Sequence, residues 1–464
     1  MAIAGATERP GFVSQAPKLG FIGGFDGIRG IGILMVLSQH AYSSLFPSAA
    51  GIVDMFFVMS AFLIVSLLMQ EHRASDSINF RKFYSRRAIR LLPTAYLCIV
   101  AWFVFAFLFD RERVVWLVQD ALAAVFYVYN IIFPVGLEFV APTVAAERSI
   151  GPYWSLAVEE QFYLFIGITV LVAIRKNWMK QLAWIMVAVA TFIGISRFMG
   201  VYGPWPSGPE VAAQEGVIPR GLSLLWLSRP DALMWGVALA VLNANMPDPL
   251  SDIWKKWLPR AATVAIFAFF GTMALSSIYL ASLFAKVGLP FPYVPMVPAP
   301  GVDPDGLLWV KFGHTVCALT FAVAMLAMAR TKGWWANRWL SWHPLRWLGR
   351  QSYTLYVWHT LFFWLILDVA GLGAILGEKT RVFVLVPVAI IMGLPVYYGV
   401  EQKMMKLKLR FSSEKEVLDL TTGKMVSIEE ASGGKVTAES LDAKSSKKID
   451  KSGDSTDSKT GVDA

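Results

Sequence analysis

Hydrophobic residues in this chain are gathered into long blocks, and charged residues collect in the short segments between them. Blocks such as 263–280 and 384–400 approach the length of about 20 residues that a helix needs to cross the hydrocarbon core of a bilayer. The pattern therefore predicts an all-α, polytopic membrane bundle of about ten transmembrane helices. We place the spans near residues 26–46, 51–70, 91–109, 154–174, 180–199, 222–244, 261–284, 307–329, 351–370 and 382–400.

The charges of the connecting segments orient these spans. The segment after the second span is rich in Arg and Lys, and the positive-inside rule places such a segment in the cytoplasm. The preceding segment, 43–51, has no charge and is expected on the outer side, so both termini are predicted to be cytoplasmic. Residues 114–133 contain Gln119, Asp120 and Asn130. A further crossing there would break the alternation of sides, and we expect an interfacial or re-entrant segment instead.

Composition and charge agree with a multi-pass protein of the cell membrane that is surrounded by lipid. Charged residues make up 16% of the chain, against about 25% in a typical soluble domain. The formal net charge of +9 favours positive-inside topology over nucleic-acid binding. We expect residues 1–25 to form a cytoplasmic N-terminal segment, 26–401 the transmembrane domain, and 411–464 a disordered cytoplasmic tail that is rich in Lys, Glu, Ser and Gly.

Two ionisable residues mark a polar stripe along the first predicted span. Arg29 and His40 are eleven residues apart, which brings them to nearly the same helix face about 16 Å apart along the axis. Ionisable groups inside a membrane are costly, so each is a candidate for function. The alternative for Arg29 is a side chain that extends to the cytoplasmic interface, and for His40 it is a hydrogen-bonded core histidine.

Two adjacent glutamates, Glu159 and Glu160, begin the fourth predicted span at a depth of roughly 8 Å. His40 lies at a similar depth from the outer end of its own span. A carboxylate beside an imidazole raises its basicity and fixes its tautomer, which suits a general base. We therefore predict that His40, Glu159 and Glu160 are catalytic, with one glutamate facing the histidine. The alternative is a pair of carboxylates that face an outer aqueous vestibule.

Further polar residues fall within the predicted spans. Asp54, Arg229 and Asp231 share the outer half and could bind substrate or form a structural ion pair. His359 lies among aromatic residues near the middle of its span, where it could contact substrate or serve packing. No histidine has a second ligand at metal spacing, so we expect no metal.

A cluster of arginines follows the second predicted span on the cytoplasmic side. Arg86, Arg87 and Arg90 could set topology alone, or they could bind the anionic part of a phosphorylated cytoplasmic donor together with Arg29. One cluster can do both.

Four motifs occur in order along the chain. They are FDGIRGIGILMVLSQH at 25–40, FFVMSAFLI at 56–64, WSLAVEEQFYL at 154–164 and YYGVEQ, which contains Glu401, at 397–402. In these motifs the chain resembles the membrane acyltransferases of acyltransferase family three over roughly 26–401. Ala61 and Ala157 stand where the family pattern has Gly and Ser.

The resemblance implies an integral membrane O-acyltransferase. Members of the family move acyl groups, often acetyl, from an acyl-CoA co-substrate to hydroxyls of glycans, lipids or small molecules, and we expect no other cofactor. The donor would bind near Arg29 and the arginine cluster, and His40 would act as general base or transient acyl carrier. We expect O-acetylation of an extracytoplasmic or lipid-linked glycan, a modification of polysaccharide.

Two alternatives remain open. A small lipophilic acceptor such as an antibiotic or a sterol would need the same motifs. A proton-coupled transporter would also place His and Glu inside the membrane.

Overall fold

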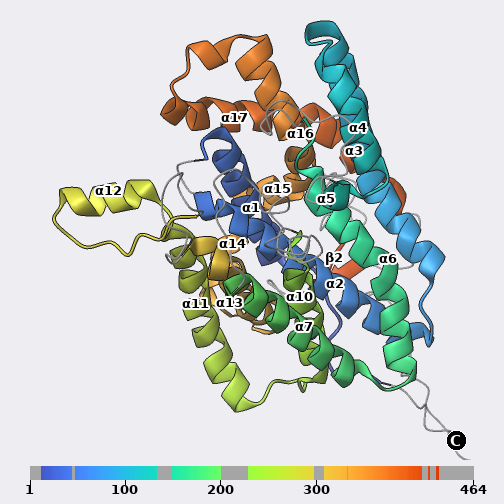
Figure 1. Ribbon diagram of the computed structural model, residues 1–464. Coiled ribbons are helices and arrows are strands. Elements are labelled where there is room, and N and C mark those ends of the chain that lie inside the picture. The colour runs from blue at the N-terminus through green and yellow to red at the C-terminus, as the bar shows by residue number, and fades with distance from the viewer. Residues whose placement is uncertain are drawn as a thin grey trace, which may run out of the picture.

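The computed structural model describes residues 12–43, 47–132, 149–199, 228–296, 308–331, 333–409, 416–418 and 425–427. Nearly all of its regular elements are helices, as the sequence predicts (Figure 1). The helices are α1 (Gly23–Ala41), η1 (Pro47–Gly51), α2 (Ile52–Ser75), α3 (Phe80–Phe109), α4 (Arg113–Val125), α5 (Tyr129–Ile132), α6 (Tyr153–Arg175), α7 (Met179–Met199), α10 (Pro230–Asn245), α11 (Asp252–Ala274), α12 (Ile278–Lys286), α13 (Trp309–Arg330), α14 (Trp335–Leu340), α15 (His343–Arg350), α16 (Ser352–Trp364), η3 (Leu365–Val369), η4 (Leu372–Ala374), α17 (Glu378–Val396), η5 (Tyr397–Glu401) and α18 (Gln402–Leu409).

Among the described residues, seven helical stretches are long and apolar enough to cross a membrane, which confirms an all-helical, multi-pass architecture. They are Pro47–Ser75, Phe80–Phe109, Tyr153–Arg175, Met179–Met199, Asp252–Ala274, Trp309–Arg330 and Glu378–Leu407. Three predicted spans are not among them. Polar residues lower the hydropathy of α1, the described part of α10 has 16 residues, and α16 has 13.

Helix α4 occupies most of the segment for which we predicted an interfacial or re-entrant course. It has 13 residues, and at about 1.5 Å per residue it is shorter than the roughly 30 Å hydrocarbon core. Gln119 and Asp120 are buried on its inner side, so these polar residues face protein.

Helix α1 lies at the centre of the bundle and packs against α2, α14, α15, α16 and α17 (Figure 1). Helix α2 packs on its other sides against α6, α10 and α13. Because α1 and α2 carry two of the four motifs, the motif residues meet in the interior of the bundle, and the elements around them hold their side chains in place.

Glycines of the first motif allow α1 and the segment of α14 and α15 to approach at backbone distance. A Cβ atom on Gly27 would lie 1.7 Å from the carbonyl oxygen of Leu340, and one on Gly30 would lie 2.2 Å from that of Leu345. On the facing helix, a Cβ on Gly349 would lie 1.7 Å from the carbonyl oxygen of Asp26. Neither backbone can move aside without shifting a helix, so only glycine fits there.

We expect Gly27→Ala to destabilise the protein by about 1–3 kcal/mol, because the added methyl group would force α1 away from Leu340. Gly271→Ala in α11 is the matched control, since a Cβ there has no neighbour within 4 Å. Thermal unfolding in detergent should show a lower Tm for Gly27→Ala alone. Equal melting of the two variants would contradict the close approach.

A short hairpin is described within the predicted tail. Strand β1 (Glu416–Leu418) pairs antiparallel with β2 (Met425–Ser427), which differs from the expectation of a tail without regular structure. The remainder of 411–464 and residues 1–11 lie outside the described residues, so their predicted character stays a prediction.

Candidate active site

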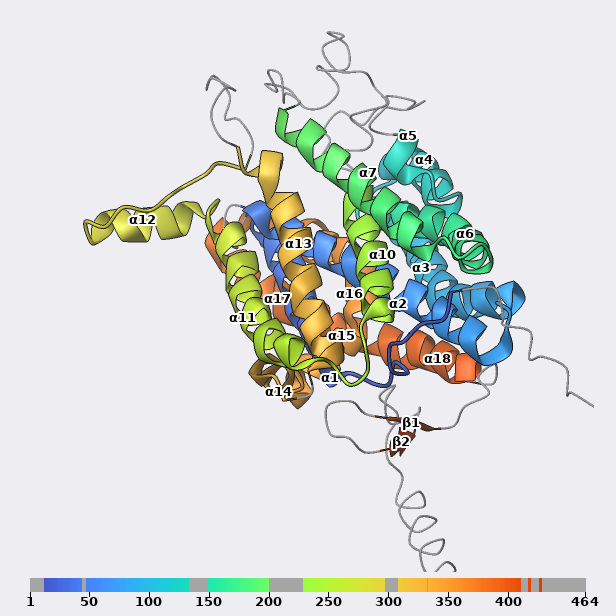
Figure 2. The ribbon, with the colours of Figure 1, turned by 90° about the horizontal axis from the view of Figure 1, so that it is seen from below.

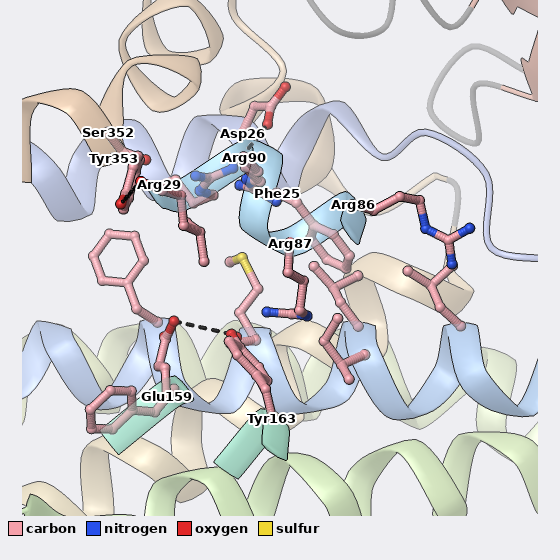
Figure 3. Close-up of a pocket in the computed structure, with 18 of the residues that line it drawn as sticks. Phe25, Asp26, Arg29, Arg86, Arg87, Arg90, Glu159, Tyr163, Ser352 and Tyr353 are labelled. Atoms are coloured by element: carbon pink, nitrogen blue, oxygen red, sulfur yellow. Dashed lines mark hydrogen bonds and ion pairs between the residues drawn. The ribbon is translucent and has the colours of Figure 1, made fainter. Parts of the chain in front are cut away.

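A cavity of about 410 Å³ lies between α1, α2, α3, α6 and α16. All four arginines predicted to bind the donor line it, although Arg29 and the cluster of α3 are far apart in the sequence (Figure 3). The start of α3 is fixed by Asn79, whose side chain accepts a hydrogen bond of 2.9 Å from the Lys82 amide. From that start, a spacing of three and four residues puts Arg86, Arg87 and Arg90 on one helix side.

The arginines differ in the partners that the protein gives them. Arg86 forms an ion pair of 3.4 Å with Glu71, and Arg29 lies 3.9 Å from Asp26. Asp26 is shared, because Arg350 also approaches it at 3.4 Å. These carboxylates compensate part of the positive charge at the cavity.

Two of the cationic side chains form no ion pair with a described carboxylate. Within the described part of the chain, neither Arg87 nor Arg90 forms an ion pair, and Nε of Arg87 is buried without a hydrogen-bond acceptor. The Arg87 guanidinium lies 3.3 Å from the centre of the Tyr163 ring. Partly buried cations without a counter-charge are costly, so this end of the cavity suits an anionic ligand.

Glu159 and Tyr163 face the arginines from α6 (Figure 3). The Tyr163 hydroxyl donates to Glu159 over 3.0 Å and also contacts the hydroxyl of Ser60. Glu160 is not among the residues that line the cavity, and its Oε1 is buried without a partner among the described residues. The two adjacent glutamates therefore have different surroundings, as expected for neighbours on a helix.

His40 has a different neighbour from the one that the sequence predicted. Its ring packs against His359, with 4.7 Å between ring centres and an angle of 60°, and no described hydrogen bond or ion pair joins it to Glu159 or Glu160. The expected His–Glu pairing is thus not formed. Sequence spacing gives positions along each helix but not the rotation of one helix against another, and Glu159 turns toward the arginines.

The two histidines are held in related ways. Nδ1 of His40 lies 3.0 Å from the carbonyl oxygen of Val36, and Nδ1 of His359 lies 2.7 Å from that of Tyr356. A proton on each Nδ1 would satisfy these carbonyls and leave each Nε2 with a free lone pair. His359 is fully buried, and its Nε2 has no partner in the described part of the chain. His40 is exposed at its end of α1.

Tyr356 connects the cavity to the histidines. It lines the cavity, and its ring centre lies 6.1 Å from that of His359. Its hydroxyl is fixed by Ser155 at 2.6 Å and by the carbonyl oxygen of Pro152 at 3.1 Å. The cavity therefore extends from the arginines to within one side chain of the histidine pair.

The residues predicted to bind substrate in the outer half have protein partners. Asp54 accepts from Arg229 at 3.2 Å and is 2.7 Å from Nδ1 of His314. Arg229 also donates to the carbonyl oxygen of Ala50 and lies 4.7 Å from the centre of the Trp154 ring. This arrangement corresponds to the structural alternative, an ion pair between helices, and none of the three charged or titratable groups lines the cavity.

Asp231 pairs with an arginine that the sequence reading missed. Arg197 at the end of α7 makes two hydrogen bonds to Asp231, of 2.7 and 3.1 Å, and both side chains are almost completely buried. A third bond of 3.2 Å reaches the hydroxyl of Thr315. Arg197 falls near the end of its predicted span, where an arginine usually extends to the interface. The one signal in the sequence was that Asp231, inside a predicted span, needs a cationic partner.

Glu401 of the fourth motif is buried and accepts a hydrogen bond from the hydroxyl of Thr354. It acts electrostatically on Arg29 and Arg90, which brings the end of the transmembrane domain to the arginine end of the cavity. Among the described residues, no group of three or more His, Cys, Asp or Glu side chains could hold a metal ion.

Comparison with known proteins agrees with the motifs. A family model described as "Acyltransferase domain" matches residues 22–400. YrhL of Bacillus subtilis is 28% identical over 339 residues, which cover 73% of this chain and 48% of YrhL. The peptidoglycan O-acetyltransferase OatA of Listeria monocytogenes is 28% identical over 340 residues, covering 73% and 49% of the two chains.

The O-acetyltransferase OatA of Staphylococcus aureus is 25% identical over 349 residues, which cover 73% of this chain and 50% of that protein. The chain thus spans about half the length of these curated relatives. No solved structure matches it.

Proposed function

Because this chain belongs to the acyltransferase family whose model covers residues 22–400, we propose that it is a membrane enzyme that moves an acetyl group from a cytoplasmic acyl-CoA to a hydroxyl of an extracytoplasmic or lipid-linked glycan. The observation that carries the proposal is the cavity. At one end it holds Arg87 and Arg90, which form no ion pair among the described residues, and at the other it approaches His359 and His40. The glycan acceptor follows from the names of the relatives from Listeria and Staphylococcus.

The arginine end of the cavity suits the phosphates of an acyl-CoA. A guanidinium presents a planar fork of donors that matches phosphate oxygens, and it stays charged at any pH of the cell. The rest of the lining is mainly apolar or aromatic, from residues such as Phe25, Phe57 and Leu63. Such a lining suits the less polar arm that carries the thioester.

The histidine end suits acyl transfer to a hydroxyl. In a direct transfer, Nε2 of His40 takes the proton of the acceptor hydroxyl while the hydroxyl oxygen attacks the thioester carbon. The C–S bond breaks, an ester C–O bond forms, and the proton passes to the leaving thiolate. In a two-step transfer, Nε2 first attacks the thioester carbon, the C–S bond breaks and the thiolate leaves. The acceptor hydroxyl then attacks the acyl carbon, the N–C bond breaks, and the hydroxyl proton passes to the thiolate. His359 packs on the ring of His40 and would position it in either route.

We further propose ten spans with both termini in the cytoplasm, on the charges of the connecting segments. In this topology the arginines face the cytoplasm and His40 lies toward the outer side. Topology reporters fused at Ser48 and at Ser446 should then report opposite sides of the membrane. The same side for both reporters would reject this arrangement.

We expect Arg90→Lys to weaken the binding of acetyl-CoA about tenfold, since an ammonium cannot replace two parallel hydrogen bonds to phosphate oxygens. Binding would be measured by calorimetry on the purified protein in detergent. Arg260→Lys is the matched control, because Arg260 is exposed on α11 and is not among the residues that line the cavity. Unchanged affinity in both Arg90→Lys and Arg87→Lys would remove the cavity as the donor site.

The activity itself can be tested in reconstituted membranes supplied with acetyl-CoA labelled in the acetyl group. Label should appear in cell-envelope glycan with the wild-type chain and be lost with Arg87→Ala. Label in an organic-soluble product that contains no sugar would instead indicate a small lipophilic acceptor. Proton flux without any transfer of label would favour the transporter and overturn the proposal.

A further inference from the structure

The segment between α11 and α13 leaves the bundle. Figures 1 and 2 both show α12 and the strand-like return after it projecting sideways, away from every other helix. All nine residues of α12 are described by the structure, and none of them is buried. We refer to residues 278–293 as the arm.

The arm has a defined shape of its own. At its turn Gly288 has a φ of +71°, and the amide of Leu289 donates to the carbonyl oxygen of Phe284 over 2.9 Å. The rings of Phe284 and Phe291 pack with 5.1 Å between their centres. At its base the amide of Val294 donates over 2.9 Å to the carbonyl oxygen of Leu275. The projection is thus a closed hairpin of chain.

The surface of the arm is unusually apolar. Leu283 is 54% exposed, Val287 63% and Leu289 56%, and Ile278 and Tyr293 are exposed as well. Lys286 is the one charged residue in the sequence of the arm. A protein surface in water rarely presents so many large apolar side chains together, and such a patch marks contact with a partner or a membrane.

The position of the arm identifies what covers it. It begins four residues after Ala274, where α11, one of the membrane-spanning candidates, ends. It also lies at the His40 end of α1, because the hydroxyl of Tyr279 is 2.6 Å from that of Tyr42. The arm therefore leaves the bundle at the level where spans end and lies crosswise to α11 (Figure 2).

We propose that the arm lies in the boundary between headgroups and acyl chains of the lipid leaflet at the His40 end of the bundle. An amphipathic segment placed there buries its apolar side chains in lipid and keeps its backbone ends and its single lysine at the headgroups. Tyr279 and Tyr293 fit the same level, since tyrosine prefers the membrane interface. The arm would hold the His40 end of α1 at a fixed height at the lipid surface.

The test uses the full chain in lipid nanodiscs with an environment-sensitive fluorophore on Leu283→Cys or Leu289→Cys. Ser75→Cys is the control, because Ser75 is exposed and is the last residue of α2. The native Cys98 and Cys317 are buried, and the unsubstituted chain reports their background. No acyl transfer is needed, so the result does not depend on the proposed activity.

Phospholipids brominated near the headgroup should quench the arm probes about twofold or more, with little quenching by aqueous iodide, and Ser75→Cys should show the reverse. Iodide quenching of the arm probes equal to that of the control would overturn the proposal. Protection of the arm probes from both quenchers, together with disulfide cross-linking between chains of unlabelled Leu283→Cys, would also overturn it, because the arm would then be covered by a second copy.

Discussion

Replacing His40 by alanine is expected to slow acyl transfer at least about 100-fold, the lower end of what a general base contributes. His40 is the exposed member of the histidine pair, its Nδ1 is bound to its own helix, and no described residue forms a hydrogen bond with its Nε2. Stability should change little, because an exposed ring contributes little buried area. Single-turnover transfer in reconstituted membranes measures the rate, and thermal unfolding measures the stability.

The role of His359 can be tested in the same assays. If His359 positions the ring of His40, His359→Ala should lower the transfer rate. The double variant His40→Ala with His359→Ala should be little slower than His40→Ala alone, because the effects of residues that act as a unit are not additive. His343→Ala is the matched control, an exposed histidine at the start of α15. A rate for His40→Ala above about a tenth of the wild-type rate would contradict a role as base or carrier.

The arginine end of the site could be predicted from the sequence because its geometry is local. Arg86, Arg87 and Arg90 lie within one turn and a half of helix, so their spacing alone puts them on one side of α3. Arg29 lies at the cytoplasmic end of the polar stripe on the first predicted span, which predicted it at the same membrane depth as these three arginines. All four arginines line one cavity, and their role with a donor stays a prediction.

The histidine end could not be predicted in the same way, because it depends on the rotation of helices about their axes. Spacing gave His40 and Glu159 a common depth, yet the contact of His40 is His359, from a helix more than 300 residues later. What fixes the rotation of α1 is its close approach to Leu340 and Leu345 through glycines. The glycines are visible in the sequence, but the partner backbone is not.

Breaking the ion pair of Arg197 and Asp231 should have the largest effect on stability. In Arg197→Met the carboxylate of Asp231 would remain buried without its counter-charge, which typically costs about 3–5 kcal/mol. Thr315 would also lose the donor to its hydroxyl. We expect a markedly lower Tm in detergent and a smaller folded yield from membranes.

The paired change Arg197→Met with Asp231→Leu should recover most of that loss, since a buried ion pair replaced by apolar residues of similar size is often neutral. Lys255→Ala is the control, because the pair of Lys255 and Asp252 is exposed and such pairs contribute little. If the double variant melted as low as Arg197→Met, the cost would come from lost packing. If Arg197→Met melted like the wild type, the apolar contacts of α7 and α10 would be enough to hold these helices together, and the ion pair would contribute nothing to stability.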